Sequence, residues 1–599
     1  MSTFTKKLEE HSEFSGTVPG AIDCTADSDA QTIPKIQRRL VTAVHLLAIA
    51  FFALFLIWGL NGNTPLNGDD VGVIRRTMLS RHNMHYDYLD WTMNRLHVVG
   101  FLHQELLMFG GSMEKANLGW LAVYAASAFA CYGFLRKLTN PLVALSGAVF
   151  YLCYSSKFEP FTWWSAGAYP FMWLTFFGLL TLLESKIRFS TKAVLITLIT
   201  AGSMYLYEVF TAIIPVISLL LLWRRRKEIG ELKFFDYLMS ALPTLLLLVH
   251  LGILASCPKP IYKFEPSTAT RFSMPVRVLT GFTSSVDATV GIKHKRDVRQ
   301  AVTIYKEYFQ NEGPSKLLLV AAVALCLIGM LVAFPLSLSN YYAPILVSVA
   351  EWSVLATATF LSAFIGFVSN LCTTPSRLTG LPSIGYMLFF CLGLQLAIAG
   401  FHTKQRWKRS VAVVAICLLS GTMLSISVRE ICAFRSILIQ AEEVAAFDRA
   451  IAEKIHALHP TISKGDEIYV RIAYPAQWSV GRWRNLSTYF TNGHASDLLA
   501  YLYGVPIGDI KYSTSPYRRP GEKESMQFVV NSWAKTGTDK VIPFFVDQQG
   551  IVLPIKDVVL HSPDGASKKL DFARQFDSST VFAPTQNIPV EALPPISGP

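Results

Sequence analysis

The chain has 599 residues, of which 51% are hydrophobic and only 16% are charged. Soluble domains carry nearer a quarter charged residues, so this composition excludes an ordinary soluble protein and indicates a polytopic membrane protein. Much of the formal net charge of +12 lies in short basic clusters between apolar segments. That distribution is typical of loops that set membrane topology, and no nucleic-acid partner is expected. The scattered cysteines show no ligand spacing and carry no functional signal.

Residues 1–34 are polar and are expected to form a disordered cytoplasmic tail. Apolar segments then predict an α-helical membrane domain over 35–430, with about 11 transmembrane helices. The expected spans are roughly 40–60, 118–135, 140–156, 166–185, 193–208, 209–223, 234–255, 316–335, 345–368, 381–400 and 410–428.

The orientation of these spans follows from Lys and Arg near their ends. Basic clusters precede the first span, follow the second and sixth, and separate the fourth from the fifth and the tenth from the eleventh. All of them fall on one side of the membrane, which predicts a cytoplasmic N-terminus. An odd number of spans then puts residues 431–599 outside, in the periplasmic or extracellular space of a cell (inner) membrane protein.

Two external loops are long. The first, 61–117, carries an apolar stripe from Leu89 to Phe109 at helical spacing, which predicts a helix at the membrane interface or one packed on the spans. The second, 256–315, contains Lys293 and Arg296 in a basic cluster. This cluster is either a phosphate-facing element or a solvated face, and the alternative is a miscounted span.

The region 431–599 is expected to be an external soluble α/β domain. Ala441 to Leu458 has a helical pattern, and Glu467 to Ile472 and Lys540 to Val546 have strand patterns. Residues 587–599 contain several prolines and are expected to form an irregular tail.

An acidic pair, Asp69 and Asp70, closes the run Asn67-Gly68-Asp69-Asp70 just after the first span. Leu40 to Leu60 contains no charged residue, so the pair is placed at a membrane surface. Either Asp69 or Asp70 is suited to take the proton of an attacking hydroxyl. The alternative is a turn that exposes two solvated carboxylates.

An acidic pair after the first span, an amphipathic segment and many spans together resemble the GT-C superfamily of membrane glycosyltransferases. The resemblance covers the layout of roughly residues 40–430. It implies a polyprenyl-phosphate sugar donor and a glycan, glycolipid or protein acceptor on the outer face of the bilayer. It also implies inversion at the anomeric centre, with Asp69 or Asp70 as the catalytic base.

A phosphate leaving group calls for cations, because they stabilise the developing negative charge. The candidates for donor-phosphate binding lie in external loops and are Arg75, Arg76, Arg95, Arg377, Lys293 and Arg296. Arginines in such places also contact lipid headgroups, which is the plainer interpretation.

Three further residues are candidates for acceptor binding. Glu208 lies near the outer end of the fifth span, where it either binds hydroxyls or caps a helical hairpin. Trp163 and Trp164 either stack on sugar rings or belong to an interfacial aromatic belt. A divalent metal site (Mg or Mn) is also left open by four histidines of the first external loop, His82, His85, His97 and His103. Their spacing is not diagnostic, and no metal ligand is assigned.

Other functions remain open at this point. An O-antigen or polysaccharide polymerase or ligase would use Arg and His in a large external loop, and the 256–315 loop fits that. A lipid-glycan flippase or transporter would place ionisable residues at the membrane midplane in repeated halves. A non-catalytic scaffold for envelope assembly is the third alternative.

Overall fold

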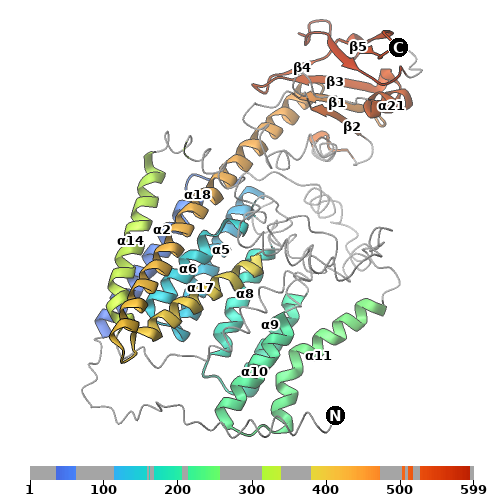
Figure 1. Ribbon diagram of the computed structural model, residues 1–599. Helices are drawn as coiled ribbons and strands as arrows, with labels where there is room; N and C mark the ends of the chain where they lie inside the picture. The colour runs from blue at the N-terminus through green and yellow to red at the C-terminus, as the bar shows by residue number, and fades with distance from the viewer. Residues whose placement is uncertain are drawn as a thin grey trace.

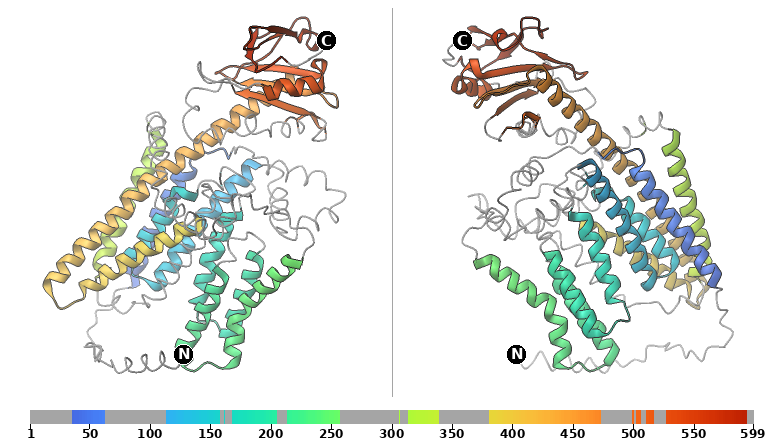
Figure 2. Two further views of the ribbon diagram at one scale, coloured as in Figure 1. Left: turned by 45° about the vertical axis from the view of Figure 1, so that its right-hand side comes forward. Right: turned by 180° about the vertical axis from the view of Figure 1, so that it is seen from behind.

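A computed structural model describes residues 35–62, 113–157, 161, 168–204, 213–256, 306, 313–338, 380–472, 499, 502–505, 510–516 and 527–593. These residues form a bundle of helices and a smaller domain with two sheets, and one long helix joins the two (Figure 1). Both views of Figure 2 show the same arrangement from other sides.

Helices account for all of the described membrane region. They are α2 (Lys35–Ile57), α5 (Met113–Leu138), α6 (Pro141–Cys153), α8 (Ala168–Leu183), α9 (Phe189–Met204), α10 (Ile214–Ile229), α11 (Phe234–Ser256), α14 (Gly313–Ser337), α17 (Gly380–Phe401) and α18 (Arg406–Leu458). Every predicted span coincides with one of them except 345–368, which lies outside the described residues.

The predicted polytopic helical fold is confirmed. Within the described residues, six helices are long and apolar enough by length and composition to cross a membrane. Three shorter apolar helices, Pro141–Cys153, Tyr169–Leu183 and Phe189–Met204, lie beside them. The count of about eleven spans stays a prediction. The amphipathic segment of the first loop lies outside the described residues.

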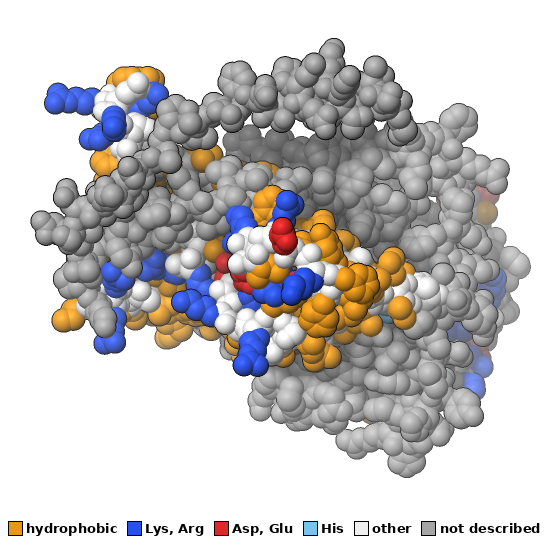
Figure 3. Space-filling model, turned by 90° about the horizontal axis from the view of Figure 1, so that it is seen from below, with side chains coloured by type: hydrophobic (Ala, Val, Ile, Leu, Met, Phe, Trp, Pro, Cys, Tyr) orange, Lys and Arg blue, Asp and Glu red, His pale blue; other side chains and the backbone are white. Residues whose placement is uncertain are grey.

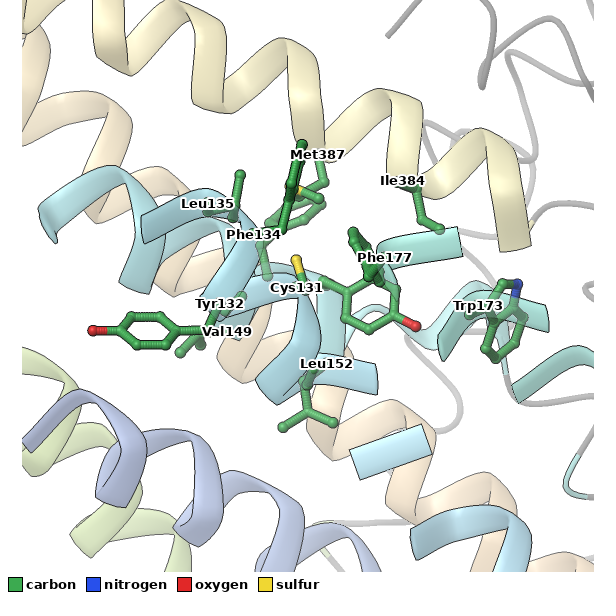
Figure 4. Packing of buried hydrophobic residues seen from close by; sticks show 14 of the residues in the cluster. Cys131, Tyr132, Phe134, Leu135, Val149, Leu152, Trp173, Phe177, Ile384 and Met387 are labelled. Carbon is green, nitrogen blue, oxygen red and sulfur yellow. The ribbon is translucent and has the colours of Figure 1, made fainter. Parts of the chain in front are cut away.

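Helix α6 forms the centre of the bundle. All of its residues are buried, and it contacts α2, α5, α14, α17 and α18. Figure 4 shows Cys131 of α5 beside Phe177 of α8 and below Met387 of α17, while Leu152 of α6 points toward the opposite side. Lipid tails are as apolar as the surfaces of the helices, so the hydrophobic effect does not drive the helices together. Close side-chain packing then determines their positions.

A buried histidine joins three of these helices. His45 of α2 makes one hydrogen bond of 3.0 Å between Nδ1 and the Tyr132 hydroxyl of α5. Its Nε2 lies 3.2 Å from the carbonyl oxygen of Gly329 in α14. Glycine at 329 permits this approach, because a Cβ there would lie 2.9 Å from Cδ2 of the His45 ring.

Basic residues gather at one end of the bundle. Arg38 and Arg39 begin α2, Arg136 and Lys137 end α5, and the start of α18 adds Arg406, Lys408 and Arg409. Arg224 to Lys227 end α10 at the same end, and Figure 3 shows the Lys and Arg side chains on this face. We call it the basic end. The opposite end, from which α18 leaves toward the sheets, is the domain-side end (Figure 1).

Helix α18 belongs to both parts of the molecule. It has 53 residues and is therefore about 80 Å long at 1.5 Å per residue. The predicted span 410–428 and the predicted helix 441–458 are segments of this one helix. Ile416 and Met423 lie in the core of the bundle, whereas Ile451 and Ile455 lie in the core of the sheet domain. The helix thus continues through residue 430, where a domain boundary was expected.

The sheet domain has a mixed α/β structure, as predicted. One sheet has the order β2-β1-β3-β4, with β1 parallel to β2 and β3, and β4 antiparallel to β3. Its strands are β1 (Glu467–Ile472), β2 (Lys511–Pro516), β3 (Val541–Val546) and β4 (Val552–Pro554). The second sheet has the order β6-β5-β7, with β5 (Asp557–His561), β6 (Ser567–Asp571) and β7 (Gln586–Pro589).

Both predicted strands of this region are confirmed as β1 and β3. Along β1, Ile468 and Val470 share a core with α18, while Tyr469 shares one with Trp533 of α21 (Gln527–Thr536). Side chains of a strand alternate between faces, so α18 and α21 cover opposite faces of the sheet. Strand β7 includes Asn587, so the predicted irregular tail begins too early: pairing with β5 orders its first residues.

Candidate functional site

All residues that the sequence nominated for catalysis or binding lie outside the described residues, so their roles stay predictions. They are Asp69, Asp70, Arg75, Arg76, Arg95, Trp163, Trp164, Glu208, Lys293, Arg296 and Arg377. What the structure does describe is the end of α2, which precedes the acidic pair in the sequence, and the side chains around that end.

Helix α2 ends in a short, well-defined exit segment, residues 58–62. The N–H of Trp58 still donates to the carbonyl of Leu54 at 2.8 Å, and the N–H of Leu60 donates to that of Ile57 at 3.2 Å. Gly59 between them has φ of +69°, the left-handed conformation that commonly ends a helix and favours glycine. The chain therefore leaves α2 in a defined direction.

Arg435 of α18 caps the end of α2. Its Nη1 donates to the carbonyl of Phe55 at 2.6 Å and to that of Leu56 at 3.3 Å. The guanidinium carbon lies 5.3 Å from the centroid of the Phe55 ring, and only 1% of the residue is exposed. The last carbonyls of a helix lack intrahelical partners and carry partial negative charge, so a cation is favourable there.

Glu442 of α18 binds the exit segment itself. The backbone N–H of Gly62 donates to Glu442 Oε1 at 2.6 Å. Arg435 and Glu442 are seven residues apart, which places them on the same face of the helix. Asp69 follows Gly62 by seven residues and so lies within about 25 Å of it. Two side chains of α18 therefore determine where the segment leading to the acidic pair begins.

A buried ionic cluster lies nearby at the domain-side end of the bundle. Glu430 of α18 accepts a hydrogen bond from the Ser155 hydroxyl in η1 (Ser155–Lys157). Arg429 donates to Glu430 Oε1 from Nε at 3.1 Å and from Nη2 at 2.7 Å. Glu430 is buried, whereas the side chain of Arg429 is 54% exposed.

Lys157, in the same 3₁₀ turn, is completely buried. Its Nζ donates to the carbonyl of Tyr151 at 2.6 Å and lies 4.4 Å from the centroid of the Tyr151 ring. The rings of Tyr154 and Tyr124 lie 5.6 Å and 5.8 Å away. Aromatic faces attract a cation, and together they enclose the ammonium group.

Burial lowers the pKa of Lys157 from its ordinary 10.5 to about 7, against smaller opposing effects of neighbouring groups that include the Glu430 carboxylate. Titratable groups with strongly shifted pKa values concentrate at functional sites. Sequence reasoning did not single out Lys157 or Glu430. The only available signal was their position, directly after the predicted spans 140–156 and 410–428, which is where headgroup-facing charges also occur.

Within the part of the chain that the structure describes, no group of three or more His, Cys, Asp or Glu side chains is arranged to bind a metal ion. The histidines of the first external loop lie outside that part. The divalent metal considered from the sequence therefore stays untested.

No protein-family model and no curated protein matches the chain. Among solved structures, the Archaeoglobus fulgidus oligosaccharyltransferase, tethered with an acceptor peptide, aligns with a TM-score of 0.37 and 12% identity, covering 91% of this chain and 75% of its own. ArnT from Cupriavidus metallidurans, bound to undecaprenyl phosphate, aligns with a TM-score of 0.28 and 10% identity, covering 86% of this chain and 93% of its own. Both are GT-C superfamily membrane glycosyltransferases, the superfamily that the sequence layout resembles. At these scores neither alignment transfers a residue role or a substrate to this chain.

Proposed function

We propose that this chain is a GT-C type membrane glycosyltransferase, which moves a sugar from a polyprenyl-phosphate donor to a glycan, glycolipid or protein acceptor. One observation carries the proposal. The exit of α2, seven residues before Asp69, is bound by Glu442 at the domain-side end of the bundle. An acidic pair that close to a helix end at a membrane surface is suited to deprotonate an acceptor beside a lipid-linked donor.

The proposed reaction is a direct displacement. An acceptor hydroxyl attacks the anomeric carbon of the donor sugar, the bond from that carbon to the phosphate oxygen breaks, and the polyprenyl phosphate leaves. Asp69 or Asp70 accepts the hydroxyl proton, an effect worth about 10²–10⁴-fold in rate. Arg75, Arg76, Arg95, Arg377, Lys293 and Arg296 are proposed to neutralise the phosphate, and Glu208, Trp163 and Trp164 to bind the acceptor.

The proposed reaction takes place on the outer face of a cell membrane. Its support is the separation of charges along the bundle: Arg38, Arg136 and Arg409 lie at the basic end, and basic loops stay cytoplasmic. The acidic pair follows the other end of α2. The sheet domain lies beyond the end of the bundle at which α2 ends, and it is proposed to select or bind the acceptor.

The deciding experiment compares Asp69→Asn and Asp70→Asn at matched expression, with envelope glycans as the readout. Loss of the base should lower transfer at least 100-fold in one of the two variants. Glu231→Gln, at an exposed position of the basic end, is the matched control and should transfer normally. Unchanged glycans in both loop variants would overturn the catalytic proposal.

A further inference from the structure

Helix α18 contacts the end of α2 through two polar side chains on one face. Arg435 caps the last turn at Phe55 and Leu56, and Glu442 accepts the N–H of Gly62. The two contacts lie before and after the helix end, at positions 55–56 and 62. Together they restrain both the helix terminus and the direction in which the chain continues.

These contacts are directional, as are the hydrogen bonds of His45 farther back in α2, whereas most other contacts of the helix are apolar. A buried guanidinium is costly unless its donors are paired, and Nη1 of Arg435 is paired with the Phe55 and Leu56 carbonyls. The Gly62 N–H and the Glu442 carboxylate make a charge-assisted hydrogen bond, which is stronger and shorter than a neutral one. A slide of α2 along α18 would break both contacts at once.

The same helix continues into the sheet domain. Phe447, five residues after Glu442, lies against the backbone at Gly550, where an added Cβ would come within 2.9 Å of the ring. Ile451 and Ile455 then enter the core of the sheet domain. Because an α-helix is stiff over this length, the position of Gly62 is tied to that of the sheet domain.

We propose that Arg435 and Glu442 are positioning residues for the transfer reaction: they fix the start of the first external loop, and so aim the acidic pair, relative to α18 and the sheet domain that it carries. This inference rests on the proposed function. Neither side chain needs to contact substrate. A misplacement of about 1 Å of a catalytic group can cost about 100-fold in rate, so two hydrogen bonds far from the chemistry suffice to control it.

The test uses the full-length protein in lipid nanodiscs with Glu442→Ala, Glu442→Gln and Glu453→Ala. The Gln side chain keeps a carbonyl oxygen that accepts the Gly62 N–H, whereas Ala does not. Glu453 lies on the exposed face of the same helix and serves as the matched control. Spin labels on unnatural amino acids at Leu66 and Lys454 report the distance between the start of the loop and α18.

We expect one narrow distance distribution and near-normal glycan transfer for the unaltered protein, Glu442→Gln and Glu453→Ala. Glu442→Ala should broaden the distribution and lower transfer at least tenfold at an unchanged melting temperature. A narrow distribution with normal transfer in Glu442→Ala would overturn the inference, as would equal losses in the Ala and Gln variants.

The same protein preparations separate this inference from the proposed function. If Asp69→Asn and Asp70→Asn both leave transfer unchanged, the catalytic proposal fails, while the distance measurement still decides whether Glu442 fixes the loop. If the Asp variants abolish transfer and Glu442→Ala changes neither distance nor rate, only the positioning role fails.

Discussion

The backbone N–H of Gly62 and the carboxylate of Glu442 form a 2.6 Å hydrogen bond between residues 380 positions apart in the chain. It joins the exit of the first described helix to the last helix of the bundle. Together with the Arg435 contacts to Phe55 and Leu56, it ties the end of α2 to α18.

Glu430→Ala should destabilise the bundle strongly. The buried carboxylate accepts the Ser155 hydroxyl and the Arg429 guanidinium and lies near the buried Lys157. Removing one partner of a buried ionic group typically costs about 3–5 kcal/mol, to be measured by thermal unfolding in detergent. Glu453→Ala is the control: its side chain lies on the exposed face of α18, so a change within about 0.5 kcal/mol is expected. Equal losses in both variants would contradict this account of the cluster.

Lys157 should make stability depend on pH. Its folded pKa of about 7 lies below the ordinary 10.5, so between these values the unfolded chain binds more protons than the folded one. The free energy of unfolding must then rise with pH in that window. From pH 7 to pH 9 the rise should be roughly 2 kcal/mol larger for the unaltered protein than for Lys157→Met. Parallel stability curves of the two proteins would show that Lys157 stays charged when folded.

Gly147→Ala should destabilise the centre of the bundle. A Cβ at this position of α6 would lie 2.6 Å from Cys391 Sγ and 2.7 Å from Leu135 Cδ1. Overpacking of this kind costs about 1–3 kcal/mol. Gly133→Ala in α5 is the matched control, because its Cβ would meet nothing within 4 Å, and it should leave stability equal or slightly higher. Melting temperatures that fall equally would argue against close packing around Gly147.

Glu467→Ala should loosen the sheet domain. The buried carboxylate at the start of β1 accepts hydroxyl hydrogen bonds from Ser513 at 2.6 Å, and from Ser532 and Thr536 of α21 at 2.9 Å each. Losing the acceptor leaves one buried and two half-buried hydroxyls without this partner, at a cost of about 3 kcal/mol. Limited proteolysis of the full-length protein should then cut the sheet domain faster. Glu453→Ala, on the exposed face of α18, should be cut at the unaltered rate.

The sequence by itself determined where most helices and the first strand lie. Apolar segments long enough for a bilayer predicted α2, α11, α14 and α17, because burial in lipid or in the bundle requires an apolar surface whatever the neighbours are. Alternation predicted β1 at Glu467–Ile472, where the structure has it. The site prediction around Asp69 and Asp70 stays a prediction, because those residues lie outside the described part of the chain.

Only the tertiary structure decided that α18 is one helix, because the sequence predicted a span at 410–428 and a separate helix at 441–458. It also decided the roles of Lys157, Glu430, Arg435 and Glu442. A charged residue near the end of an apolar segment has the same local sequence whether it faces headgroups or a buried partner. Which of these occurs depends on side chains hundreds of residues away, and so the approach to the acidic pair became visible only when α2 and α18 were brought together.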